Sequence, residues 1–325
     1  DEYPVGLREV FSTDRHLLIY GEEYRHNPYG HLAFIGLKQL IQPISTGGLG
    51  ELGGPDYPSN SQILDIALDQ GATTIAAHFG NFTRYEDPIR TPWPSTGYEM
   101  PVDVALGKIQ LAEIAGNGGS LEVWYDILNC GFQMPATAGP DWSIKDTPRV
   151  YVSLGEKDFT FENWCEGLQA GRSFITDGAM LQFSVNDQLA GSTLHFDAGP
   201  VHLQVDAQAM MPGGRVPYEI VVNGEVVKRS SDSSQAIRMN DSGWIAIRSG
   251  QAHSNPVYVE FAGRPAGMMA PAKNFINVIT QLEDWVARKA LFDNENQKRE
   301  VLAELEKGKV VYQEIIARAQ KLGRK

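Results

Sequence analysis

The sequence has few of the features that mark several common protein classes. Its 325 residues include only two cysteines, Cys130 and Cys165, which have neither CxxC nor Cys/His spacing, so two separate thiols are favoured over a cysteine-based zinc site. No apolar run approaches the roughly 18 residues that a membrane-spanning helix needs. No Lys/Arg-rich block comes before the tail "KLGRK", and the formal net charge is −12. We therefore expect neither membrane insertion nor a nucleic-acid partner.

The sequence does have enough apolar material for a sizeable core. Hydrophobic residues make up 42% of the composition, and the length suffices for two domains or for one large domain with additional segments. The pattern of short apolar runs changes twice along the chain. These changes predict a first domain over residues 1–178, a second over 179–265 and a helical segment over 266–325.

Residues 1–178 have the pattern of an α/β domain. The segment "SNSQILDIALDQG" has apolar residues at helical spacing, a Ser/Asn start and Gly71 as a stop, and the apolar run "ATTIAAH" follows it directly. Further along, "SLEVWYDILNCGF" predicts a second helix that ends at Gly131. Helices followed at once by short apolar strands are typical of α/β proteins.

The rest of the chain has two other patterns. Over residues 179–265, short alternating strands without helices between them predict an antiparallel β-sandwich, and "VVNGEVV" predicts a hairpin with a type I′ turn at Asn223-Gly224. Over residues 266–325, helical periodicity predicts amphipathic helices, the second of them broken or kinked near Gly308.

Polar side chains stand where several of the predicted strands of the first domain end. A strand over "LLIYGEE" places its two acids on opposite faces, so only one can point into a site, and we choose the second. A single histidine at a strand end is more often structural than functional. As a set, however, the donors suit Zn²⁺, Mn²⁺ or Fe²⁺. The predicted ligands, which neighbouring barrel strands would bring to one mouth, are Glu23, His31, His78 and Asp141.

The motifs around these residues resemble a known family. They are "GEEYRHNPYGHLAFIGL", "GATTIAAHFGN", "WYDILNCGFQMPATAGPDWS", "TPRVYVSL" and "LQAGRSFITDGAMLQFSVN". Together they resemble the later motifs of the PHP (polymerase and histidinol phosphatase) superfamily of metal-dependent hydrolases. More narrowly, they are similar to its carbaryl-hydrolase-like branch, in which a β-sandwich follows the PHP barrel. The resemblance covers about residues 15 to 265.

The resemblance also implies a ligand set. The Glu of the family's Gly-x-Glu strand end falls on Glu23, its Gly-His ligand on His31, and the His of its Ala-His-Pro motif on His78, although Phe79 replaces the proline. The family's Gly-Ser-Asp ligand falls on Asp141. A further family histidine two residues later is Ser143 in this chain.

The family's first two motifs, His-x-His and an Asp-His pair, are absent from the sequence. None of the seven histidines stands in a His-x-His, and "TDRH" interposes Arg15 between its Asp and His. The chain therefore resembles a PHP protein that lacks roughly its first barrel strands. Without them, the site should bind its metal more weakly, and open sheet edges favour association into a homo-oligomer.

Three further residues are predicted to contact a substrate. Arg149 in "PRVYV" and Arg172 in "AGRSF" have guanidinium groups that orient anionic or carbonyl groups, although a structural ion pair explains them equally well. Trp142 directly follows a proposed ligand and is the best aromatic candidate for the pocket. No residue stands out as a catalytic acid, base or nucleophile.

Two functions are compatible with this pattern. The first is a metal-dependent hydrolase that uses a metal-activated water on an ester, carbamate or phosphoester bond of a small-molecule substrate. The second is a truncated or non-catalytic PHP-like chain in which the β-sandwich and the helices serve as a binding or assembly module. The absent His-x-His motif favours the second, and the remaining ligand set favours the first. The sequence does not decide the localisation, and only the resemblance points towards export.

Overall fold

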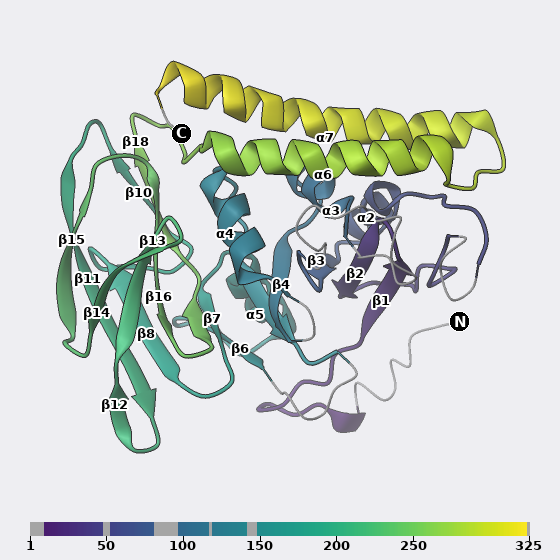
Figure 1. Ribbon diagram of the computed structural model, residues 1–325. Coiled ribbons are helices and arrows are strands. Elements are labelled where there is room, and N and C mark those ends of the chain that lie inside the picture. Colours follow the sequence, from purple (N-terminus) through teal and green to yellow (C-terminus); the bar gives the residue numbers. More distant parts are fainter. Residues whose placement is uncertain (1–9, 48–52, 81–96, 117–118, 142–147, 324–325) are drawn as a thin grey trace. The chain divides into compact units, whose positions relative to one another are not determined.

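The computed structural model describes residues 10–47, 53–80, 97–116, 119–141 and 148–323. It is a mixed α/β structure with several sheets and a C-terminal helical segment (Figure 1). The chain forms two compact units. The first comprises Asp1–Glu113, Gly118–Ser120 and Ala272–Ala317, and the second comprises Ile114–Asn117, Leu121–Pro271 and Arg318–Lys325. The domain limits predicted from the sequence stay a prediction.

The first sheet begins in the first unit. Its strand order is β1-β2-β3-β4-β5, and β4 passes from the first unit into the second. Strands β1, β2 and β3 are joined by antiparallel pairing, whereas β3 and β4 are parallel. The strands are β1 (Gly21–His26), β2 (Gly30–Ile35), β3 (Thr73–Ala77), β4 (Leu111–Gly116) and β5 (Ala136–Gly139).

This sheet differs from the predicted one at its start. The strand expected over "LLIYGEE" begins only at Gly21 and continues to His26, so Glu23 lies inside β1 instead of ending it. Because β1 and β2 form an antiparallel hairpin, His31 stands near the beginning of β2. The expectation that Glu23 stands where its strand ends is therefore wrong.

Helix α2 (Asn60–Asp69) forms where the sequence predicts it. At its start, the side chain of Gln62 accepts a hydrogen bond from the N–H of Ser59 (3.0 Å), and Gly71, with φ +81°, follows its end. The carboxylate of Glu99, just before α3 (Met100–Ala105), accepts hydrogen bonds from the N–H groups of Asn60 (2.9 Å) and Ser61 (3.1 Å). The orphan amides of α2 are thus satisfied by a buried acid.

The C-terminal segment consists of α6 (Met269–Arg288) and α7 (Glu295–Lys321). Lys309 of α7 forms an ion pair with Glu283 of α6 at 2.6 Å. The break predicted near Gly308 is absent, because α7 runs through this residue without interruption. A Cβ atom on Gly308 would lie 2.8 Å from a side-chain carbon of Val102 in α3, so the glycine permits close helix packing. Within the described residues, neither these helices nor any other has the length and apolar character to cross a membrane.

The second unit contains two further sheets and the helices α4 (Leu121–Asn129) and α5 (Phe161–Gln169). One sheet has eight strands, which are β6 (Arg149–Val152), β7 (Ser173–Thr176), β10 (Thr193–Phe196), β13 (Tyr218–Val222), β14 (Glu225–Ser230), β16 (Gly243–Ser249), β17 (Ala252–Ser254) and β18 (Val257–Phe261). The other has five strands, which are β8 (Met180–Val185), β9 (Gln188–Leu189), β11 (Val201–Met211), β12 (Gly214–Val216) and β15 (Ser234–Met239).

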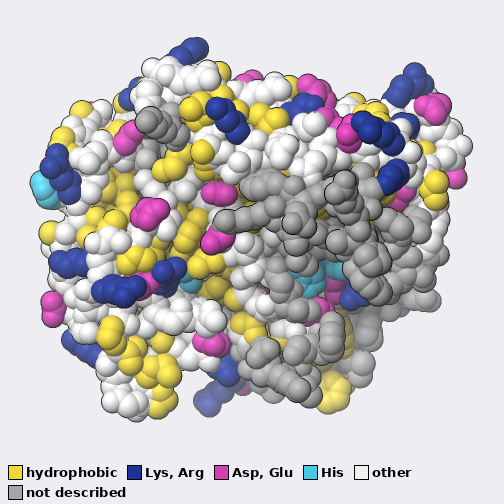
Figure 2. Space-filling model, viewed as in Figure 1, with side chains coloured by type: hydrophobic (Ala, Val, Ile, Leu, Met, Phe, Trp, Pro, Cys, Tyr) yellow, Lys and Arg dark blue, Asp and Glu magenta, His cyan; other side chains and the backbone are white. Residues whose placement is uncertain are grey.

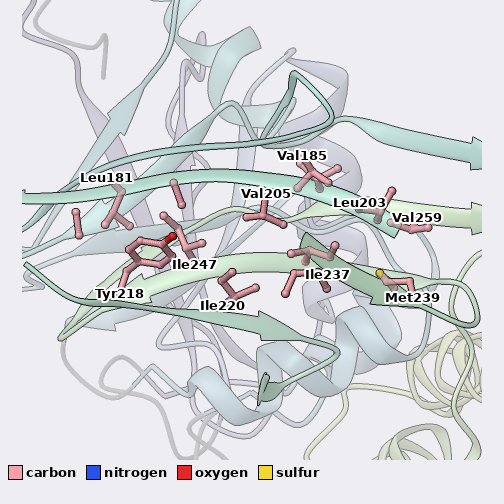
Figure 3. Packing of buried hydrophobic residues seen from close by; sticks show 14 of the residues in the cluster. Leu181, Val185, Leu203, Val205, Tyr218, Ile220, Ile237, Met239, Ile247 and Val259 are labelled. Carbon is pink, nitrogen blue, oxygen red and sulfur yellow. The ribbon is translucent and has the colours of Figure 1, made fainter. Parts of the chain in front are cut away.

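These two sheets share one hydrophobic core in a sandwich-like arrangement (Figure 3). Strands of the five-stranded sheet contribute Val205 and Ile237, and strands of the eight-stranded sheet contribute Ile220 and Val259. The alternating pattern of β11, in which every second residue from Leu203 to Ala209 is buried, is what a strand with one face on a core requires.

The hairpin of β13 and β14 confirms the predicted turn. Asn223 and Gly224 join the strands and both have positive φ, at 52° and 92°. On the face of the molecule shown in Figure 2, basic and acidic side chains are interspersed among the described residues.

Candidate metal centre

The hairpin of β1 and β2 places two predicted ligands on one face of the sheet. Glu23 pairs with Ala33, and Arg25, two residues later, pairs with His31. Directly opposed residues share a face, and alternate residues of a strand point to the same side. The side chains of Glu23, Arg25 and His31 therefore project from the same face.

His78 reaches this face by an unusual backbone conformation. In the pairing of β2 with β3, His31 lies opposite Ala77, so simple alternation would send the next side chain to the other face. His78 instead has φ +52°, in the left-handed region, which redirects its side chain towards Glu23. Such a conformation costs a non-glycine residue on the order of 1–3 kcal/mol and is concentrated at functional sites.

The three side chains bring their donor atoms together. One nitrogen of each imidazole and one carboxylate oxygen all lie within 4.8 Å of one another. Oε1 of Glu23 is 3.1 Å from Nδ1 of His31 and 3.7 Å from Nε2 of His78. A tetrahedral Zn²⁺ ion with bonds of 2.0–2.2 Å holds its ligand atoms about 3.3–3.6 Å apart. The two separations from Oε1 of Glu23 are close to these values.

The hydrogen bond to Asn27 fixes which nitrogen of His31 faces the carboxylate. Nε2 of His31 lies 3.2 Å from Oδ1 of Asn27 and donates to it, because an amide oxygen only accepts. In the neutral imidazole, Nδ1 then carries a lone pair. This Nδ1 and Oε1 of Glu23 are both buried, and they are not aligned for a hydrogen bond to each other or to another described atom. Two lone pairs at 3.1 Å repel unless a proton or a metal ion lies between them.

Glu23 is a carboxylate at neutral pH. Burial raises its pKa, but imidazole N–H groups of His31 and His78, in the form that donates to the carboxylate, and the guanidinium of Arg25 outweigh this effect and hold the pKa well below its usual value. Nη2 of Arg25 lies 3.3 Å from the second carboxylate oxygen, Oε2. Arg25 thus holds one oxygen while the other faces the imidazoles. Two imidazoles and one carboxylate form a donor set that binds catalytic zinc and non-haem iron.

Two other polar residues of β1, Glu22 and His26, are buried and have structural hydrogen bonds. Glu22 is buried on the opposite face, where it accepts a hydrogen bond from the N–H of Ile41 at 2.9 Å. His26 is completely buried; its Nε2 donates to Asp56 (3.1 Å), and its Nδ1 accepts from the N–H of Tyr29 (3.2 Å). The alternation that selected Glu23 over Glu22 is therefore present in β1.

The remaining predicted site residues have other positions. Asp141 follows β5 in the second unit and has φ +52°, whereas the group of three donors belongs to the first unit and does not include it. Arg149 begins β6, and Nη2 of Arg172 lies 3.3 Å from Oε1 of Glu166. Trp142 lies outside the described residues.

Two residues that contact the site, Arg25 and Asn27, are not among those predicted from the sequence. Arg25 could have been found, since the alternation that selects Glu23 places it on the same face. Asn27 gave no signal, because its contact with His31 depends on the geometry of the turn between β1 and β2.

No protein-family model, no curated protein and no solved structure matches the chain. The role of the three side chains is therefore inferred from their own chemistry.

Proposed function

We propose that Glu23, His31 and His78 hold one divalent metal ion, Zn²⁺, Mn²⁺ or Fe²⁺, and that the protein is a metal-dependent hydrolase. The main observation in support is that Nδ1 of His31 and Oε1 of Glu23 are buried 3.1 Å apart without a hydrogen bond to each other. When bound, such an ion lowers the pKa of a water ligand and polarises the bond under attack. Ester, carbamate and phosphoester bonds of small molecules are the proposed substrates.

The residues of the chain prepare the site before any ion arrives. Oδ1 of Asn27 accepts a hydrogen bond from the Nε2–H of His31 and so keeps the Nδ1 lone pair directed at the site. Arg25 fixes the carboxylate by its Oε2, which leaves Oε1 for the ion. The left-handed backbone at His78 supplies the third donor.

The proposal includes membership of the PHP superfamily. The first sheet is proposed to be part of a PHP-type barrel, and the two sheets with the shared core are proposed to be the β-sandwich of the carbaryl-hydrolase-like branch. Asp141 as a further ligand, and Arg149, Trp142 and Arg172 as substrate contacts, stay predictions. Association into a homo-oligomer and export stay predictions as well.

Metal content and hydrolysis test the proposal together. The purified chain is treated with EDTA, supplied with Zn²⁺, Mn²⁺ or Fe²⁺, and analysed for bound metal by mass spectrometry. Hydrolysis of a nitrophenyl ester and of a nitrophenyl phosphate is then measured. We expect about one bound ion per chain, and we expect His31→Ala and His78→Ala to lose both the ion and the activity.

The chain offers a matched control for these variants. His195 also lies beside an acid, with Nδ1 at 3.3 Å from Oε2 of Glu260, but its side chain is 67% exposed. His195→Ala should leave metal content and hydrolysis unchanged. Metal content that is the same in the wild type, His31→Ala and His78→Ala would show that the ligand set is wrong. Metal binding without hydrolysis would favour the non-catalytic alternative, a binding module.

A further inference from the structure

A cleft with a volume of about 640 Å³ lies within the second unit. Its lining comes mainly from β6 and β7 of the eight-stranded sheet and from β8, β9 and β11 of the five-stranded sheet. The volume falls in the range of cavities that bind small molecules. None of the three proposed metal ligands lines this cleft.

Aromatic rings form part of the lining. Tyr151 and Phe174 are direct partners in the pairing of β6 with β7, and their rings stack with centroids 5.2 Å apart and planes 8° from parallel. Phe183 of β8 also lines the cleft. Tyr151 is 38% exposed, so part of its ring is open to a ligand. A stacked, exposed ring of this kind offers an apolar face next to a hydroxyl group.

Polar side chains gather on one face of the five-stranded sheet. Gln182 of β8 lies opposite Gln208 of β11, and Ser184 lies opposite Asp206. Alternation places all four on the same face, and all four line the cleft. Together they offer two amides, a hydroxyl and a carboxylate, which can both donate to and accept from a ligand.

The charges in the lining do not select a charged ligand. Arg172 is the cation of the cleft, but its guanidinium already pairs with Glu166, whose carboxylate also pairs with Lys157. Asp206 is the anion, and its oxygens accept from the amide of Gln204 at 3.0 and 3.2 Å. One partnered charge of each sign leaves no excess charge to hold an anion or a cation.

We propose that this cleft binds a short neutral oligosaccharide. The ring of Tyr151 packs against the C–H face of a sugar ring. The amides of Gln182 and Gln208 and the carboxylate of Asp206 hydrogen-bond to its hydroxyl groups, each of which donates one bond and accepts others. The proposal is independent of the metal centre, since the lining residues all belong to the second unit.

Titration calorimetry of the full chain tests this assignment. The probes are cellotriose, maltotriose, xylotriose and tri-N-acetylchitotriose. At least one of them should bind at a single site, and Tyr151→Ala should weaken that binding about tenfold, because it removes both the stacking and the apolar contact. Gln208→Ala should weaken it as well. EDTA should not change the affinity.

A control variant separates the cleft from the rest of the surface. Phe159 is 44% exposed and does not line the cleft, so Phe159→Ala should bind the sugar like the wild type. Absence of binding by all four sugars would overturn the proposal. Binding that survives both Tyr151→Ala and Gln208→Ala would overturn it too, as would Tyr151-dependent binding of anilinonaphthalene sulfonate without any sugar binding.

Discussion

His31 is oriented by Asn27. The amide oxygen of Asn27, in the turn between β1 and β2, lies 3.2 Å from Nε2 of His31 and accepts a hydrogen bond from its N–H. The other ring nitrogen then presents its lone pair to Glu23, 3.1 Å away. Asn27 is not itself a proposed ligand, but it determines which nitrogen of His31 faces the proposed metal site.

Removal of this hydrogen bond should weaken metal binding without abolishing it. We expect Asn27→Ala to lower the affinity for Zn²⁺ about 10–100-fold, the usual effect of losing a partner of a ligating histidine. Asn27→Asp keeps an acceptor at the same place and should retain most of the affinity. Competition with a chromogenic chelator measures both. Asn296→Ala, on the exposed surface of α7, is the control.

The strained backbone at His78 leads to a second prediction. Alanine at φ +52° keeps the steric cost of the left-handed region, whereas glycine avoids it. In EDTA, His78→Gly should therefore be more stable than His78→Ala by about 1 kcal/mol in urea unfolding. Both variants should lose the ion equally. Equal stabilities would mean that the conformation is not strained.

Local patterns predicted several elements of the fold correctly. Helix α2 with its Gly71 stop, helix α4 with Gly131 after it, and the Asn223-Gly224 turn all depend on neighbouring residues, and all are present. Gly308 was misjudged for a physical reason. A glycine inside a helical pattern signals a weak point in an isolated helix, but here it allows α7 to approach Val102.

The candidate site could be predicted in part. Alternation selects Glu23, the end of the run "ATTIAAH" selects His78, and the donor set and the family resemblance add His31. The structure brings the three within reach of one another. The antiparallel pairing of β1 with β2 could not be predicted, because strand pairing depends on contacts between distant parts of the chain. Nor could the left-handed conformation of His78, which depends on how the loop after β3 is held.

The sequence also did not predict which sheet β6 and β7 join. Their ranges fall in the segment that resembles an α/β domain, yet β7 pairs with β17 and joins the eight-stranded sheet. This non-local pairing brings aromatic residues to the cleft. The cleft could therefore not be predicted from the order of the motifs along the chain.

The contact of α7 with α3 gives a third prediction. A methyl group on Gly308 would meet three carbon atoms of Val102 at 2.8–3.0 Å. Gly308→Ala gains about 1 kcal/mol in helix propensity, but overpacking of this kind costs about 1–3 kcal/mol, so we expect a net loss of stability. Val102→Ala should reduce that loss in the double variant, as a double-mutant cycle of urea unfolding will show. Val102→Ala removes only the nearest of the three atoms, Cγ1, so additive effects would mean that Cγ1 is not the atom that limits the approach.

The buried acids Glu99 and Asp103 should make stability depend on pH. Burial raises the pKa of Glu99 from its ordinary 4.5 to about 7, although hydrogen bonds from the N–H groups of Ser61 and Asn60 lower it. Burial, and then the charge of Glu99, raises the pKa of Asp103 well above its usual value. Neither oxygen of Asp103 has a hydrogen-bond partner among the described residues. The folded state thus keeps protons that the unfolded chain releases.

The contribution of Glu99 to the free energy of unfolding should therefore be greatest below about pH 4.5 and should fall as the pH rises towards 7. The slope is at most about 1.4 kcal/mol per pH unit for each proton that the folded state retains. Asp103→Asn removes one of the two acids and its repulsion of the other. It should therefore stabilise the protein in mildly alkaline buffer and change little in acid, as urea unfolding across this range will show. Asp284→Asn, at a surface ion pair with Arg288, is the matched control and should leave the pH dependence unchanged. If Asp103→Asn and the wild type have the same slope, the two carboxyl groups do not interact as their burial implies.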